Sequence, residues 1–117
     1  MSDYSYEAKL RLADFGSAFK LRSAQDTTCF RIGTPGYIAP EIIKGDFYSF
    51  SCDIWSLGCL LYVLLAATPP FWDMDRKVRE HKACNEVLNF DTLSYTKGLS
   101  DSCKELLTAL LEKDPAQ

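Results

Sequence analysis

The sequence predicts a mainly helical protein with one short strand and one long exposed loop. Three observations support this fold class. Residues 54–68 are apolar over a helical length, residues 99–115 carry apolar side chains at helical spacing, and residues 17–36 are polar and broken by Gly and Pro. The 117 residues, 47% hydrophobic and 25% charged, correspond to about one globular domain.

The first element is a short strand in "KLRLADF", where Leu10 and Leu12 alternate with polar residues before a turn at Gly16. Residues 17–36 then show no hydrophobic period. A loop of this length inside a compact domain is commonly functional.

Helices follow the loop. "PEIIKG" predicts a short helix that begins at Pro40 and ends at Gly45. Residues 51–67 predict a second helix, apolar on all sides and therefore buried, which Pro69 and Pro70 terminate. "DMDRKVREHKACNEV" predicts an amphipathic, charge-rich helix on the surface.

The last predicted helix lies in "LSDSCKELLTALLEKDP" and ends at Pro115. Ser100 or Ser102 can cap it, and Ser102 with Glu105 fits a capping box. Its apolar face consists of Cys103, Leu106, Leu107, Leu110 and Leu111.

Composition excludes several classes of function. The net charge of -3 argues against nucleic acid or an acidic membrane as the main partner. Residues 54–68 are too short to span a bilayer, and no signal peptide opens the chain. Five cysteines without a C-x-x-C pair, and a single histidine, His81, predict reduced thiols in the cytoplasm or nucleus rather than a metal cluster.

The tripeptide Asp14-Phe15-Gly16 by itself fits a turn after a strand with a buried Phe, and by itself it carries no function. It is followed by "GTPGYIAPE" at residues 33–41 and by "SCDIWSLGCLLY" at residues 51–62. Asp-Phe-Gly, a loop and Ala-Pro-Glu, in this order, resemble the activation segment of protein kinases. "TPPFW" and "LLEKDPAQ" resemble later parts of the same lobe, so that the resemblance covers residues 9–117.

"GTPGYIAPE" and "PPFW" look most similar to the calmodulin-dependent kinase group. The resemblance implies a serine/threonine protein kinase, which transfers a phosphoryl group from ATP to protein Ser or Thr with Mg²⁺. It implies that residues 1–117 form a partial kinase domain, a C-lobe without the N-lobe and the catalytic loop. The partners implied are ATP, a protein substrate and the rest of the kinase domain.

The resemblance assigns the cofactor site to the tripeptide. Asp14 would bind Mg²⁺, because a hard cation prefers carboxylate oxygens. Phe15 would pack into the core and set the direction of Asp14, and Gly16 would let the backbone take either orientation.

The substrate site implied by the resemblance is a ledge that receives the residue after the target hydroxyl. It consists of Thr34, Pro35, Gly36 and Tyr37. Two further carboxylates are implied to be structural. Glu41 would pair with an arginine late in the lobe, and Asp53 would accept backbone hydrogen bonds from the catalytic loop.

No catalytic residue is expected within this chain, since "H-R-D-x-x-x-x-N", a Gly-rich phosphate loop and a strand lysine are not found in it. We therefore expect the chain alone to be inactive. The alternative function is a non-catalytic interaction module, derived from a kinase or belonging to a pseudokinase.

The loop offers Thr27 and Thr28 as phosphorylation sites, with a solvated loop that lacks a switch as the alternative. Cys29, two residues before Arg31, fits either redox sensing or a position without function. His81, in the charged helix, fits a plain surface position.

Overall fold

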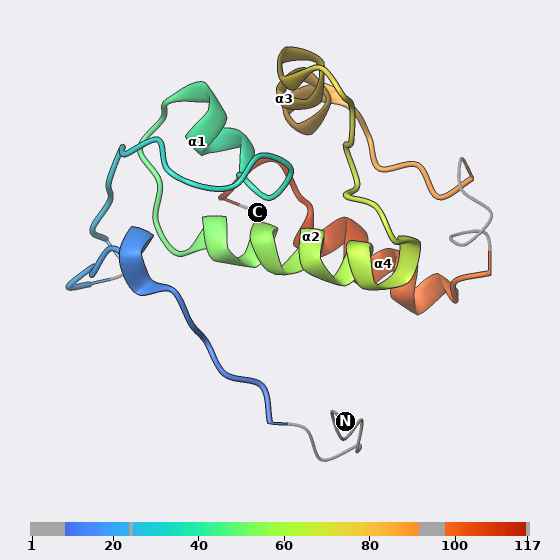
Figure 1. The fold of residues 1–117 in the computed structure, drawn as a ribbon, viewed down its shortest axis with the longest axis horizontal. Coiled ribbons are helices and arrows are strands. Elements are labelled where there is room, and N and C mark those ends of the chain that lie inside the picture. Colours follow the sequence, from blue (N-terminus) through green and yellow to red (C-terminus); the bar gives the residue numbers. More distant parts are fainter. Residues whose placement is uncertain (1–8, 24, 92–97, 117) are drawn as a thin grey trace.

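The structure, a computed structural model, describes residues 9–23, 25–91 and 98–116 (Figure 1). In chain order its elements are a 3₁₀ turn η1 (Phe15–Ser17) and four α-helices, α1 (Pro40–Lys44), α2 (Ser51–Ala66), α3 (Arg76–Asn85) and α4 (Asp101–Leu110). The mainly helical prediction is confirmed, and the four predicted helices are all present within a few residues of their predicted bounds.

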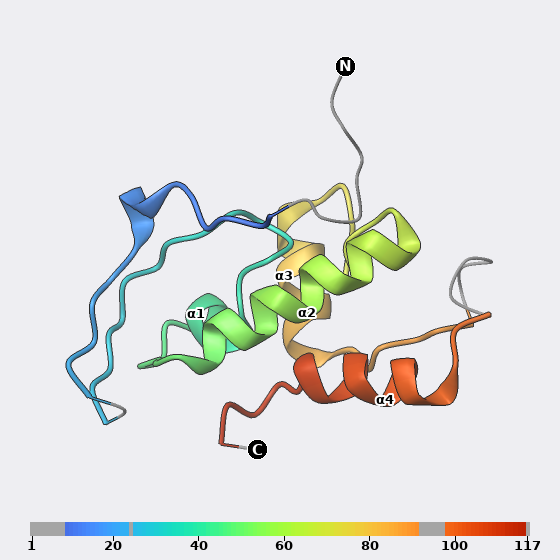
Figure 2. The ribbon, with the colours of Figure 1, turned by 90° about the horizontal axis from the view of Figure 1, so that it is seen from below.

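Helix α2 organises the fold, because α4 packs along it while α1 packs against α3 (Figures 1 and 2). The approach of α2 and α4 depends on Gly58. A Cβ atom at this position would lie 2.9 Å from Leu110 Cβ and 3.0 Å from Leu111 Cδ2. Any side chain at position 58 would therefore push α4 away from α2.

Two apolar clusters form the core. In the larger cluster, Trp55 of α2 stacks on Phe71 with ring centroids 5.8 Å apart, and Cys59 and Leu111 are buried beside them. The ammonium group of Lys113 lies 4.1 Å from the centroid of the Phe71 ring. The smaller cluster, between α2 and α4, contains Tyr62, Ala66 and Leu107.

Helix α2 is not buried on all sides, contrary to the prediction. Trp55 and Cys59 are buried, but Ile54, Leu57 and Leu64 on other faces are 50%, 52% and 75% exposed. The described residues supply enough apolar surface to cover one face of this helix. The all-round apolar pattern therefore marks a helix that the described residues cover only in part.

The predicted strand at residues 9–15 is also absent. Residues 9–14 are irregular, and Leu10 and Leu12 are 100% and 89% exposed. A strand is stable only when a neighbour pairs its backbone groups. Within the described ranges the only β-type pairing is an isolated antiparallel bridge between Thr28 and Tyr48.

The helix ends follow the expected chemistry, with one correction. Gly45 ends α1 with a φ of 79°, the left-handed conformation that glycine tolerates. Asp75 caps α3 by accepting hydrogen bonds from the backbone N–H groups of Lys77 and Val78. Ser100, not Ser102, caps α4, so the Ser102–Glu105 capping box is wrong because Ser102 lies within the helix.

Among the described helices none combines the length and the apolar character that are needed to cross a membrane.

Candidate functional site

Asp14 stands in an unusual backbone conformation. Its φ of 60° and ψ of 67° place a non-glycine residue in the left-handed region, immediately before η1. Such strain in a non-glycine residue is typical of functional sites. We expected the conformational freedom to lie at Gly16, but the positive φ belongs to Asp14.

Gly16 lies beside the Asp14 carboxylate, where a side chain would make only an ordinary contact. A Cβ atom at position 16 would lie 3.5 Å from Asp14 Oδ1. The side chain of Asp14 is exposed. An open, hard oxygen donor of this kind fits one ligand of a Mg²⁺ ion whose other ligands come from phosphates and water. In the described residues no group of three His, Cys, Asp or Glu side chains gathers around a common point.

Phe15 does not pack into the core of the described residues. Its side chain is 68% exposed, against the expectation of a buried ring that sets the direction of Asp14. The physical reason is that none of the core clusters reaches this end of the molecule. The nearest aromatic contact in the loop is between Phe19 and Phe30, whose ring centroids lie 6.0 Å apart.

The loop is held to the helical body at Tyr48. The Tyr48 backbone exchanges two 2.9 Å hydrogen bonds with Thr28, and the Tyr48 hydroxyl donates a 2.6 Å hydrogen bond to the Phe30 carbonyl. The two predicted phosphorylation sites consequently differ. Thr28 is 7% exposed in this conformation, whereas Thr27 is exposed. Cys29 is exposed and forms no disulfide.

The predicted ledge is a tight turn. The backbone N–H of Tyr37 donates a 3.1 Å hydrogen bond to the Thr34 carbonyl. Pro35 and Gly36 occupy the two central positions, and Gly36 has a φ of 97°. Pro followed by a positive-φ Gly is what a type II turn requires. The four residues predicted from sequence therefore form one local unit.

Helix α2 holds this turn through a hydrogen bond. The Ser56 hydroxyl lies 2.9 Å from the Tyr37 carbonyl, to which it donates, and 3.1 Å from the carbonyl of Cys52 in its own helix. Sequence reasoning missed Ser56. Its place three residues after Asp53 on the same helix was the only available signal.

The two carboxylates that we expected to be structural differ in burial. Glu41 is 6% exposed, and its carboxylate accepts a 3.4 Å hydrogen bond from the Ser51 hydroxyl. No described cation lies within ion-pair distance of Glu41. Asp53 is exposed at the start of α2, where the Cys52 thiol lies 3.9 Å from its Oδ1.

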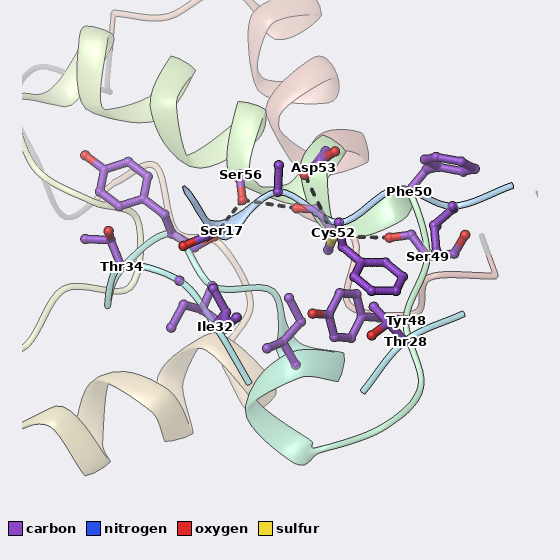
Figure 3. Close-up of a pocket in the computed structure, with 17 residues that line it drawn as sticks. Ser17, Thr28, Ile32, Thr34, Tyr48, Ser49, Phe50, Cys52, Asp53 and Ser56 are labelled. Carbon is purple, nitrogen blue, oxygen red and sulfur yellow. Dashed lines mark hydrogen bonds between the residues drawn. The ribbon is translucent and has the colours of Figure 1, made fainter. Parts of the chain in front are cut away.

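A pocket of about 350 Å³ separates the loop after Gly16 from the start of α2 (Figure 3). Ser49 also lies at this pocket, but its hydroxyl is buried and has no hydrogen-bond partner among the described residues. Such a buried, unpaired hydroxyl is uncommon in native structures. The pocket also brings together residues from both predicted sites and from α2, namely Ser17, Thr34, Tyr37, Asp53 and Ser56.

Burial and nearby carboxylates make the thiols beside this region poor nucleophiles. Burial, with the charges of Asp53 and Glu41, raises the pKa of Cys52 to about 11. Burial raises the pKa of Cys59 to about 12, against the opposing charge of Lys113. Neither thiol is therefore a candidate for nucleophilic chemistry.

Sequence reasoning also missed a contact between the loop and α3. Glu80 accepts a 3.0 Å hydrogen bond from Arg31 Nη2 and a 2.8 Å hydrogen bond from Arg76 Nε. The bond from Arg76, with the added charge of Arg31, lowers the pKa of the Glu80 carboxyl. Glu80 thus stays ionised and connects the segment before the ledge to α3. His81, as predicted, is exposed on the same helix.

Comparison with known proteins matches residues 2–117 to the family model described as the protein kinase domain. The chain is 37% identical over 109 residues to the rat rhodopsin kinase GRK1, covering 93% of this chain and 19% of that protein. It is 38% identical over 110 residues to the serine/threonine-protein kinase PKZ1 of Phytophthora infestans, covering 91% of this chain and 27% of that protein. Mouse G protein-coupled receptor kinase 4 is 37% identical over 108 residues, 92% of this chain and 18% of its own length.

These relatives do not single out the expected subgroup. They include G protein-coupled receptor kinases, and none of these three is named as a calmodulin-dependent kinase. "GTPGYIAPE" and "PPFW" are too short to separate kinase groups. The chain spans between about a fifth and a quarter of the length of the curated relatives it matches. Its fold, its motifs and this match together show that the chain belongs to the protein kinase family.

Proposed function

We propose that this chain is the part of a serine/threonine protein kinase that contributes the magnesium ligand and the substrate ledge. The observation that carries the proposal is the exposed carboxylate of Asp14, a residue with a left-handed backbone, on the same loop as the Thr34–Tyr37 turn. A metal ligand and a peptide-binding turn on one loop fit phosphoryl transfer, which depends on positioning and charge neutralisation.

In this proposal Mg²⁺, when bound, neutralises charge on the phosphate oxygens of ATP. Asp14 holds the metal through a carboxylate oxygen, and its left-handed backbone fixes the direction of that carboxylate. Phe15 and Gly16 position Asp14, with the exposed Phe15 ring covered by a part of the kinase outside the described residues. The residues of the turn hold the substrate backbone beside the target hydroxyl.

The remaining residues have supporting roles. The exposed Asp53 carboxylate offers acceptors to a backbone segment that enters the pocket. The buried Glu41 carboxylate forms an ion pair with a cationic side chain from outside the described residues. Thr27 is the better phosphorylation site of the two, because Thr28 is buried. An intracellular location agrees with five free thiols.

The alternative is a non-catalytic interaction module. It is favoured by the apolar side chains of Ile54, Leu57 and Leu64, which α2 leaves exposed. Such a module would bind a partner through α2 and would have no need of the Asp14 carboxylate.

One substitution separates the two functions. Asp14→Asn in the complete protein that contains this chain replaces a carboxylate with a neutral amide of the same size. For a kinase, the rate of phosphoryl transfer should fall by about a hundredfold or more at an unchanged melting temperature. Near-normal turnover in the variant would reject Asp14 as the metal ligand. An absence of transfer in the parent protein, with partner binding unaffected by the substitution, would favour the module.

A further inference from the structure

Beside the ledge lies an arginine, Arg79, that forms no ion pair with a described residue. Its neighbours differ in this respect, because Arg31 and Arg76 share the carboxylate of Glu80. Arg79 is therefore a cation without an acidic partner among the described residues, in a chain whose net charge is -3.

The Arg79 side chain has a defined position, but one of its N–H donors lacks a hydrogen-bond partner among the described residues. Its Cζ atom lies 4.6 Å from the centroid of the Trp72 ring, and its Nη1 donates a 3.0 Å hydrogen bond to the Asp73 carbonyl. Its Nε–H is buried and has no hydrogen-bond partner among the described residues. A buried N–H of a charged group that lacks an acceptor is costly, so this side chain is prepared for a ligand that accepts hydrogen bonds.

The unsatisfied group adjoins the ledge. Arg79 lines a narrow cavity of about 20 Å³ together with Pro35 and Gly36. This volume holds a single oxygen atom, as of a water molecule or one arm of a carboxylate. Trp72 is also close to the turn, because a Cβ atom on Gly36 would lie 3.9 Å from its ring. The ledge and the Arg79–Trp72 pair therefore form one continuous surface.

We propose that Arg79, resting on Trp72, is a specificity-determining residue that binds an acidic side chain of the protein substrate, two to four residues after the target hydroxyl. This inference rests on the proposed kinase function. The residue directly after the hydroxyl occupies the ledge, and the following residues pass over Trp72. The two oxygens of the acidic carboxylate accept from the edge of the guanidinium that is not buried, next to the buried Nε–H. This two-point pairing is specific to arginine, because a lysine ammonium lacks the planar fork.

The kinetic test uses the complete kinase that contains this chain and pairs of peptides. Each pair differs only by Glu or Gln at the second, third or fourth position after the target Ser. At one position, kcat/KM should be about tenfold higher for the Glu peptide, as expected for a hydrogen-bonded charge pair. In Arg79→Gln this ratio should fall to about one, and in Arg79→Lys to an intermediate value. A ratio taken within one enzyme is unaffected by a loss of folded protein.

The matched control is Arg22→Gln, which removes the same charge from an exposed residue that does not line the cavity. It should retain both the ratio and the rate. Equal kcat/KM values for all Glu and Gln pairs in the parent enzyme would overturn the inference, as would a ratio that Arg79→Gln leaves unchanged.

A second measurement does not require catalysis. In the ¹⁵N-labelled 117-residue chain, the Nε–H signal of Arg79 is identified by its loss in Arg79→Lys. Titration with the Glu peptide should shift this signal, and the Gln peptide should not. If the cavity holds only a water molecule, neither peptide moves the signal, and the inference is overturned. If no peptide is phosphorylated but the Glu peptide shifts the signal, the kinase function fails and the acidic-peptide site stands.

Discussion

The Ser56 hydroxyl of α2 donates a 2.9 Å hydrogen bond to the main-chain carbonyl of Tyr37, the last residue of the ledge. A side chain of α2 thus holds in position a turn whose last residue lies 19 residues earlier in the chain. Because one backbone hydrogen bond closes the turn itself, this contact connects the proposed substrate ledge to the core.

Ser56→Ala should therefore lower the free energy of unfolding by about 1 kcal/mol and raise KM for a protein substrate more than it lowers kcat. Chemical denaturation and steady-state kinetics of the complete kinase measure these quantities. The matched control is Thr108→Ala, because the Thr108 hydroxyl donates to the Lys104 carbonyl within its own helix, at 2.8 Å. An equal rise in KM for both variants would show that Ser56 has no special relation to the ledge.

Glu41→Gln should act in opposite directions in two proteins. In the 117-residue chain, the buried Glu41 carboxylate has only the Ser51 hydroxyl as a described side-chain partner, so a neutral amide should leave the melting temperature unchanged or raise it. In the complete kinase, where we propose a cationic partner, the same change should destabilise the domain by about 3 kcal/mol. The same decrease in both proteins would argue against a partner outside the described residues.

Tyr48→Phe should release the loop without unfolding the helical body. It removes the 2.6 Å hydrogen bond to the Phe30 carbonyl and keeps the ring. Loss of about 1 kcal/mol of local stability should speed amide exchange and proteolysis near residues 28–32 by roughly fivefold. Ser23→Ala, which removes a hydrogen bond to Asp26 in the same loop, should leave exchange at residues 28–32 unchanged. If both variants speed exchange there equally, Tyr48 does not hold the loop.

The five thiols should react in an order set by their surroundings. Cys59 and Cys52, with pKa values of about 12 and about 11, hold on the order of one thousandth or less of their thiols as thiolate at pH 8. Iodoacetamide should therefore modify the exposed Cys29 first, and peptide mapping by mass spectrometry identifies the site. Early labelling of Cys59 would contradict its buried position.

The same two thiols predict a fall in stability at high pH. Their pKa values are higher in the folded chain than the usual 9.0, so the folded state retains protons that the unfolded state loses. Their contribution to stability is complete below pH 9 and is lost as pH rises toward 11 and 12. Burial lowers the pKa of Lys113 and acts in the opposite direction, so the comparison of the parent with Cys59→Ala isolates the thiol. An identical pH dependence in both would contradict this assignment.

The 117-residue chain by itself should transfer no phosphoryl group. The groups that act together with a magnesium ligand in kinases are not found in this sequence, and such groups are strongly interdependent. Incubation with labelled ATP, Mg²⁺ and a basic protein measures transfer. Transfer above background that disappears in Asp14→Asn would contradict this expectation.

Local chemistry made the helices and the ledge predictable. Pro40 and Gly45 bound a helix by their own conformational preferences, and Pro35-Gly36 can hardly form anything but a tight turn. The prediction of a strand at residues 9–15 was wrong, because the alternation of Leu10 and Leu12 leads to a strand only where a neighbouring strand supplies hydrogen bonds. The prediction that Phe15 is buried was wrong for a related reason, since no described residues cover its ring.

Contacts between distant elements could not be predicted. The Arg31–Glu80 pair joins residues 49 positions apart, and no periodicity relates them. The Arg79–Trp72 contact depends on which face of α3 is directed toward the ledge. A charge-rich sequence pattern does not determine that orientation. The left-handed conformation of Asp14 was likewise not predicted, because only a few per cent of non-glycine residues adopt it, although Asp does so more often than most.

The apolar side chains that stay exposed, on α2 and elsewhere as at Leu10 and Leu12, have a consequence for how the chain responds to denaturant. The folded chain exposes 8981 Å², against about 6,400 Å² for a compact monomer of its mass. Unfolding therefore uncovers less new surface than the length of the chain would suggest. The slope of unfolding free energy against urea concentration scales with that newly exposed area, as does the heat-capacity change. Both should be low for 117 residues, which makes the thermal transition broad, and both should increase when a binding partner covers Ile54, Leu57 and Leu64.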